Sequence, residues 1–259
     1  MSAADFLLFE FPCNEKIRMY LRLESLFRHY DWFCSQDSSV AHQAAIASLF
    51  DLLDATARSD LRNELIQELE RHRQRLMQLR GNREVNQETL IRTLDELGTA
   101  ISGVAGSVGR TGQSVRENQW LQLIRTRQSI AGGTCEFDLP QLHLWLNQSP
   151  LLRRTELQSY VATLAPIRQA ATLLLRLLRA NSVRSDYVAR GGTVQISMPR
   201  GQSYALAQIW LPSDSGVVPE VSANKYMLWI RFSRPDAEHK LHPVRSENIS
   251  FSMGLSSLN

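Results

Sequence analysis

Arginine side chains give this sequence its clearest capacity for chemistry, which is the binding of carboxylates or phosphates. Lysine and arginine together number 29, and only Lys16, Lys225 and Lys240 are lysines. A guanidinium group is planar and always charged, and it can donate two parallel hydrogen bonds to one carboxylate or phosphate. A genomic bias toward arginine codons would give the same composition. The excess therefore permits an anion-binding surface without demonstrating one.

Arg18 and Arg22 fall on one face of a predicted helix. Apolar residues recur every three or four positions over residues 15–35, and Arg18 and Arg22 recur with the same period on the opposite face. Asn14 is placed to cap the start of this helix. We therefore expect a first helix that turns a basic stripe toward solvent.

The remaining candidate cations need more context. Arg231 lies in an alternating stretch, Tyr226–Phe232, so it must project from the sheet face opposite the apolar side chains. His143, beside leucines and a tryptophan, is either a structural residue or a donor in an anion pocket. Pairs such as Arg153 with Arg154 are interpreted as solvated surface.

Catalytic signatures are absent. The sequence contains no GxxxxGK[ST] loop, no GxSxG elbow and no HExxH pair. The glycines between 103 and 112 recur every third residue, which indicates a flexible connector more than a phosphate cradle. The three cysteines, few and far apart, fit a reducing compartment and no metal site: Cys13, Cys34 and Cys135. We expect no catalytic residue, no metal and no cofactor.

The elements that position these residues change in kind near residue 182. Before it, helical periodicity predicts helices at 15–35, 39–57, 60–80, 87–102, 113–129, 141–147, 150–164 and 167–181. After it, period-two alternation broken by glycine and proline predicts short antiparallel strands. A lone N-terminal strand would leave its backbone groups unpaired, so we expect it to join the C-terminal sheet.

The predicted fold is therefore α+β. It comprises an N-terminal strand over 1–12, a helical domain over 13–182 and an antiparallel β-domain over 183–259, which the strand joins. The N-terminus lacks the basic region of a secretory signal, and the longest apolar stretch, Leu173–Leu178, is broken by Arg176. We expect a cytoplasmic protein without a membrane insertion.

Two blocks of sequence point to a family. Residues 8–24 read LFEFPCNEKIRMYLRLE, and residues 123–146 read LIRTRQSIAGGTCEFDLPQLHLWL. Both resemble the ZapD family of cell-division proteins, as do the length and the order of helices and strands. Ala131 stands where many members have proline, and Gln119 and Met227 stand where some have a basic residue.

The resemblance implies a function and a site. ZapD proteins are cytoplasmic, non-catalytic homodimers that bind the acidic C-terminal tail of the tubulin-like protein FtsZ. They crosslink its protofilaments into bundles and support the mid-cell division ring. The positions matching basic residues of the family, which we expect to bind the tail, are Arg18, Arg22, Arg125, Arg127, His143, Lys225 and Arg231.

Two other functions stay open at this point. An arginine-rich nucleic-acid-binding protein would suit the sequence pI of about 8.9, although the basic residues alternate with acids and show no recognised DNA-binding pattern. A phosphotransferase using the glycine-rich segment 103–112 would need a base or a metal cluster, and neither is visible.

Overall fold

A computed structural model describes residues 6–58, 60–107, 109–198, 204–224 and 226–257. The chain divides into two compact units. The β unit comprises residues 1–18 and 175–259, and the helical unit comprises residues 19–174. The predicted fold class is confirmed, because an N-terminal strand precedes the helices and antiparallel sheets follow them.

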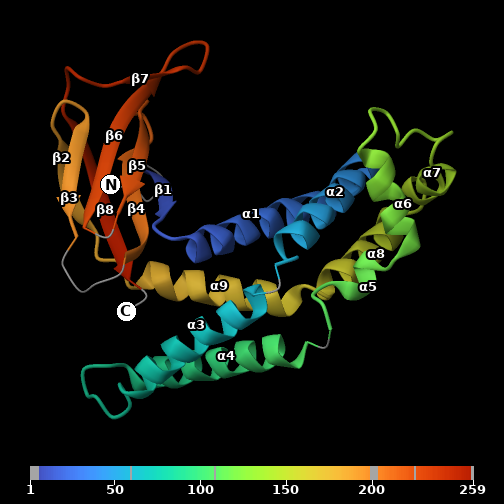
Figure 1. Cartoon of the computed structure of the whole chain (residues 1–259), viewed down its shortest axis with the longest axis horizontal. Helices are drawn as coiled ribbons and strands as arrows, with labels where there is room; N and C mark the ends of the chain where they lie inside the picture. The colour runs from blue at the N-terminus through green and yellow to red at the C-terminus, as the bar shows by residue number, and fades with distance from the viewer. Residues whose placement is uncertain (1–5, 59, 108, 199–203, 225, 258–259) are drawn as a thin grey trace. The chain divides into compact units, whose positions relative to one another are not determined.

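The β unit contains two antiparallel sheets (Figure 1). The first has the order β1 (Phe6–Pro12), β4 (Tyr204–Pro212), β8 (Ile249–Ser257) and β2 (Ser185–Ala189). The second has the order β3 (Thr193–Ser197), β6 (Met227–Pro235) and β5 (Val218–Ala223), with β7 (Leu241–Pro243) also paired to β6. Strand β1 pairs with β4 along its whole length, which confirms that the N-terminal strand joins the C-terminal sheet.

Buried side chains from both sheets form the core of the β unit. In β6, Leu228, Ile230 and Phe232 are buried and alternate with residues that are more exposed, as period two requires. Strand β4 is different, because five consecutive residues from Ala205 to Ile209 are buried. A strand covered on both faces shows no alternation.

The helical unit is held by packing between helices distant in sequence. It contains α2 (Ser39–Ala55), α3 (Leu61–Met77), α4 (Gln87–Gly106), α5 (Gln113–Arg116), α6 (Gln119–Gln128), α7 (Pro140–Leu146) and α8 (Pro150–Ala162), and it shares α1 (Glu15–Ser35) and α9 (Ala165–Ala180) with the β unit. The buried Tyr30 hydroxyl of α1 donates to the Leu157 carbonyl of α8 at 2.7 Å. Asn14 caps α1 as predicted, by accepting from the Ile17 N–H at 3.0 Å.

Two sequence predictions for this unit were wrong. Helix α4 continues through Gly103 to Gly106, so the glycine-rich connector is shorter than expected. The helix expected over 113–129 is two helices, because Asn118 caps α6 by accepting from the Leu121 N–H at 3.1 Å.

Gly112 explains part of this connector. Its φ is +66°, and a Cβ there would lie 2.6 Å from Leu53 Cδ2 of α2. Only glycine combines that backbone conformation with so close an approach. This glycine therefore serves packing, which argues against a phosphate cradle in this segment.

Within the described residues, no single helix is long and apolar enough to cross a membrane. Only α8 and α9 taken together reach that length and composition, and they are bent by 71° at their junction.

Candidate anion-binding site

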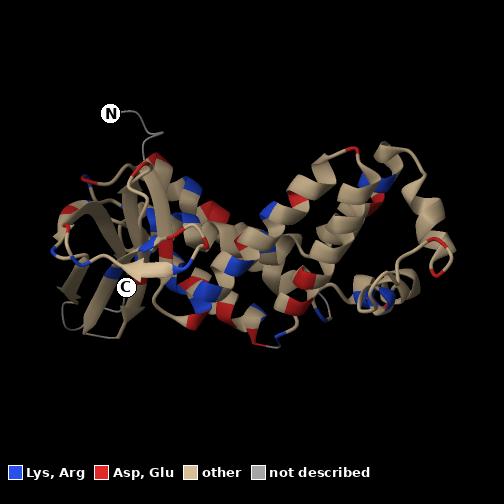
Figure 2. Cartoon of the chain, turned by 90° about the horizontal axis from the view of Figure 1, so that it is seen from above, with Lys and Arg blue, Asp and Glu red and all other residues tan. Residues whose placement is uncertain are grey.

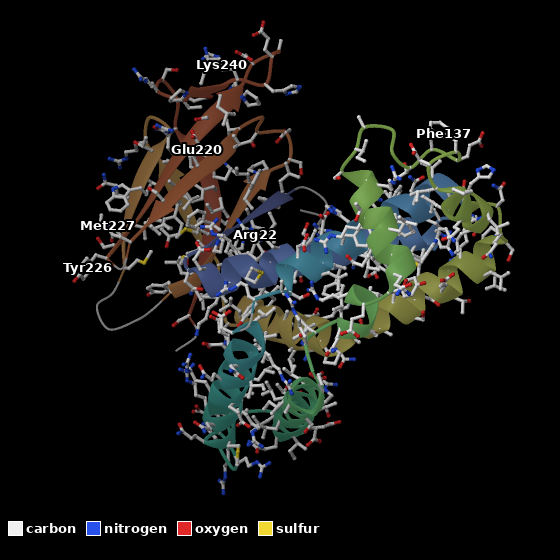
Figure 3. The ribbon with its side chains drawn as sticks, turned by 45° about the vertical axis from the view of Figure 1, so that its right-hand side comes forward. Arg22, Phe137, Glu220, Tyr226, Met227 and Lys240 are labelled. Atoms are coloured by element: carbon white, nitrogen blue, oxygen red, sulfur yellow. The ribbon has the colours of Figure 1, made fainter. Side chains whose placement is uncertain are left out.

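Helix α1 carries the first two candidate cations, one turn apart. The Nε of Arg18 donates to Glu15 Oε1 at 3.1 Å, and the side chains of both are solvent-accessible. Arg22 is exposed, and its side chain has no ion-pair or hydrogen-bond partner within the described part of the chain (Figure 3). The predicted stripe therefore exists, with one cation engaged and one available.

Arg125 is tied to the neighbouring helix. Its Nη2 lies 2.6 and 2.7 Å from the two carboxylate oxygens of Asp54 on α2, and its guanidinium lies 5.7 Å from the centre of the Phe50 ring. A guanidinium that shares both oxygens of a carboxylate and covers an aromatic ring is well oriented. This arginine fastens α6 to α2.

Arg127 and His143 face two acids of one loop. Arg127 Nη1 lies 3.5 Å from Asp138 Oδ1, and His143 Nδ1 lies 3.6 Å from Glu136 Oε2. The loop can fold back on the end of α6 because Gly133 has no Cβ, which would collide with the Arg127 carbonyl. The structure thus brings these two candidates together.

His143 lies at the surface. Its side chain is 54% exposed, so its imidazole is accessible from solvent. The neighbouring Trp145 is buried and donates its indole N–H to Glu156 at 2.7 Å. The tryptophan anchors α7 and leaves the histidine at the surface.

Arg231 projects from β6 on the side opposite Leu228 and Ile230, as expected. Its Nε and Nη2 donate to the two oxygens of Glu220 on β5 at 3.1 and 2.9 Å. Hydrogen bonds from Arg231, and then from Ser233, hold the pKa of Glu220 below its usual value. The labelled Glu220 lies on the sheet in Figure 3. Arg231 also lines a groove of about 880 Å³ together with Trp229 and Gln195.

Lys225 lies outside the described residues, between Asn224 and Tyr226. The half-exposed Tyr226 lies at the same end of the sheet as Met227, and Lys240 lies toward the opposite end (Figure 3).

Arg153 corrects the surface interpretation given to the arginine pairs. Only 4% of it is exposed, and its guanidinium donates to His42 Nδ1 at 2.9 Å and to the carbonyls of Leu146 and Asp37 at 2.7 and 2.9 Å. A buried arginine surrounded by carbonyls organises backbone and cannot receive an external anion. Its neighbour Arg154 pairs with Asp37 at 2.6 Å.

Five of the candidate cations thus share one property. Within the described chain, each of Arg18, Arg125, Arg127, His143 and Arg231 already faces a carboxylate, and we call these five the paired cations. Figure 2 shows the same interleaving of basic and acidic residues on a larger scale. The described residues contain no group of histidine, cysteine or acidic side chains suited to a metal. The arrangement is suited to exchanging carboxylate partners.

The acid partners were missed by sequence reasoning for a physical reason. Asp54 lies 71 residues from Arg125, and Glu220 faces Arg231 only through the register of two strands. Glu15, three residues before Arg18, is the one such partner that helical spacing alone reveals.

Comparison with known proteins places the chain. A family model described as cell division protein ZapD matches residues 21–231. Cell division protein ZapD of Bordetella petrii is 43% identical over 97% of this chain and 99% of the relative, and that of Bordetella pertussis is 42% identical over 98% and 99%. Cell division protein ZapD of Dechloromonas aromatica is 42% identical over 88% of this chain and 90% of the relative. The chain belongs to the ZapD family of cell-division proteins.

Proposed function

We propose that this protein is a non-catalytic adaptor that binds the acidic C-terminal tail of FtsZ through its exposed cations. It acts as a cytoplasmic homodimer at the mid-cell division ring, where it crosslinks FtsZ protofilaments into bundles. Family membership supports the role in division. The resemblance implies the partner and the residues.

The observation that carries the proposal is the two-point grip of Arg231 on Glu220. The two hydrogen bonds orient this guanidinium toward a carboxylate at the sheet surface, which supports its use for a carboxylate of the tail. Trp229 lines the same groove and offers apolar area beside the charge. A short peptide that mixes acidic and aliphatic side chains suits both groups.

Exposed ion pairs can exchange partners at little expense. Such pairs contribute roughly 0–1 kcal/mol each, so an incoming carboxylate can replace an internal one without a large loss. Arg22 needs no such replacement, because its side chain has no partner within the described residues. Tail binding should therefore combine one available cation with several exchangeable ones.

A single site should be weak. Ordering a flexible tail costs about 2–5 kcal/mol, which leaves an affinity on the order of micromolar, or about −8 kcal/mol. Two sites on a dimer meet many tails on one polymer, and the second contact then forms at a high effective concentration. Dimerisation thus allows two low-affinity sites to crosslink two filaments.

Sedimentation tests this proposal directly. FtsZ filaments are pelleted with the protein, in parallel with filaments of FtsZ that lacks its C-terminal tail. We expect bundles to pellet only when the tail is present. Equal pelleting of the two filament types would refute tail binding.

A further inference from the structure

The helical unit contains a segment, residues 71–92, in which basic residues outnumber acidic ones. Helices α3 and α4 form a hairpin joined by the turn over residues 78–86 (Figure 1). Six arginines and two glutamates fall between residues 71 and 92, although the whole chain has a net charge of only +3. This segment alone is more positive than the complete protein.

Most of this charge has no internal counterpart. Arg71 pairs with Glu68 at 2.8 Å, and Arg73 pairs with Glu70 at 3.0 Å. For the other four, no ion-pair or hydrogen-bond partner of the side chain lies within the described residues, and we call these four the hairpin arginines: Arg75, Arg80, Arg83 and Arg92. Unlike the paired cations, they project an unneutralised field.

The side chains of Gln87 and Asn82 order the turn that carries Arg80 and Arg83. The Gln87 amide accepts from the Gly81 N–H at 3.2 Å and donates to the Asn82 carbonyl at 2.9 Å. Asn86 also caps α4 through the Thr89 N–H at 2.9 Å. Both arginines are thus displayed from a fixed backbone, which lowers the entropy lost on binding.

A groove opens beside these charges. It has a volume of about 800 Å³ and lies between α3 and α4, with Arg73, Met77 and Arg80 on one side and Asp95, Gly98 and Ser102 on the other. A Cβ added at Gly98 would meet nothing within 4 Å, so the space above this glycine is open. Met77 is 45% exposed at the groove wall.

The chemistry of this region selects its occupant. Residues 51–119 contain no phenylalanine, tyrosine or tryptophan. Single-stranded nucleic acids are usually held by stacking on aromatic rings, which this region lacks. A concave groove that carries the apolar side chain of Met77 and two arginines against the single acid Asp95 fits a short acidic protein segment.

We infer that the α3–α4 groove is a second binding site, which takes an acidic segment of a protein partner and buries one of its aliphatic side chains against Met77. The carboxylates of that segment pair with Arg80 and with neighbouring hairpin arginines. The site uses none of the candidate cations, so its occupant is independent of the tail binding proposed above.

The probe is a fluorescent peptide of about twelve residues, with leucine at every third or fourth position and glutamate elsewhere. Its affinity for the full chain is measured by anisotropy. Reversing two charges with Arg80→Glu and Arg83→Glu should weaken binding about tenfold. The matched control, Arg190→Glu with Arg245→Glu in the β unit, makes the same charge change and should leave affinity unchanged.

A second variant isolates the groove from the charge. Gly98→Leu fills the open space, keeps every arginine and replaces glycine by a better helix former, so it should fold and also lose about tenfold in affinity. Circular dichroism checks folding, and Ser102→Leu on the same wall replaces it if needed. Undiminished peptide binding by the filled groove would overturn the inference.

Two competitors complete the test. A single-stranded oligonucleotide and vesicles rich in phosphatidylglycerol are titrated against the same protein. Weaker binding of both than of the peptide supports a protein partner. Tighter binding of either, indifferent to Gly98→Leu, would show a bare electropositive surface and would also overturn the inference, as would failure of the peptide to bind at all.

Discussion

The paired cations and the hairpin arginines use the same guanidinium chemistry in opposite settings. Arg231 donates from two nitrogens to the two oxygens of Glu220, and Arg125 donates from Nη2 alone to both oxygens of Asp54. Arg80 and Arg83 stand on a rigid turn without an acid partner within the described residues. The difference shows that the number of arginines does not measure the positive field of a surface, because internal acids decide how much remains.

The two settings also predict different recognition. A paired guanidinium is already oriented, so it favours a ligand that reproduces the geometry of the carboxylate it displaces. An unpaired guanidinium attracts any nearby anion, and salt screens that attraction within about 10 Å at 0.1 M ionic strength. We therefore expect the paired cations to select a ligand by the geometry of its carboxylates, and the hairpin to attract anionic ligands from a distance.

The largest contrast should appear in stability. Arg153→Met removes the donor to the buried His42 and to the partly buried carbonyls of Leu146 and Asp37, which should lower the free energy of unfolding by about 3 kcal/mol. Arg80→Met removes an exposed side chain without such partners and should change it by less than about 0.5 kcal/mol. Urea denaturation of both variants measures the difference. Equal losses in the free energy of unfolding would show that burial does not make Arg153 more important for stability than Arg80.

Affinity for the FtsZ tail should respond most strongly at Arg22. Arg22→Glu replaces an available cation by an anion, and we expect a loss of about tenfold. The control is Arg28→Glu, an exposed arginine on the same helix whose direction differs from that of Arg22 by about 120°. Titrations of both variants with a tail peptide test whether binding uses the Arg22 face. Equal losses of affinity in the two variants would mean that the effect depends only on total charge.

Removing an internal competitor should have a smaller effect of opposite sign. Glu220→Gln leaves the Arg231 guanidinium without its carboxylate, so tail affinity should rise by about threefold, or roughly 0.6 kcal/mol. Arg231→Gln should lower it. A fall in both variants would mean that the tail needs the ion pair intact and that the exchange of carboxylates is wrong.

Sequence reasoning reached the parts of this molecule that are local. The cap at Asn14, the change of period near residue 182 and the outward direction of Arg231 depend on neighbours within a few positions. Strand β4 was not predicted individually, because burial on both faces removes its alternation. The pairing of Arg125 with Asp54 depends on how α6 packs on α2, which no local pattern encodes.

The smallest predicted effect concerns a histidine of the α3–α4 hairpin. His72 is buried on α3, close to Arg75 and Arg71. Burial, and then Arg75, lower the pKa of His72 from its usual 6.5, and Glu68 only partly offsets this. Below about pH 6.5 the imidazole of His72 is protonated in the unfolded chain but stays neutral in the folded chain. The contribution of His72 to folding stability is therefore complete above that pH, and it is lost as the pH falls toward the lowered pKa.

We therefore expect the melting temperature to drop between about pH 7.5 and about pH 5.5, and to drop less in His72→Leu than in the wild type. Part of the drop should persist in that variant, because burial also lowers the pKa of His42. If His72→Leu retained the whole drop, neither the burial of His72 nor its neighbour Arg75 would be a source of the acid sensitivity, and the electrostatic contrast between the two regions would be weaker than their geometry indicates.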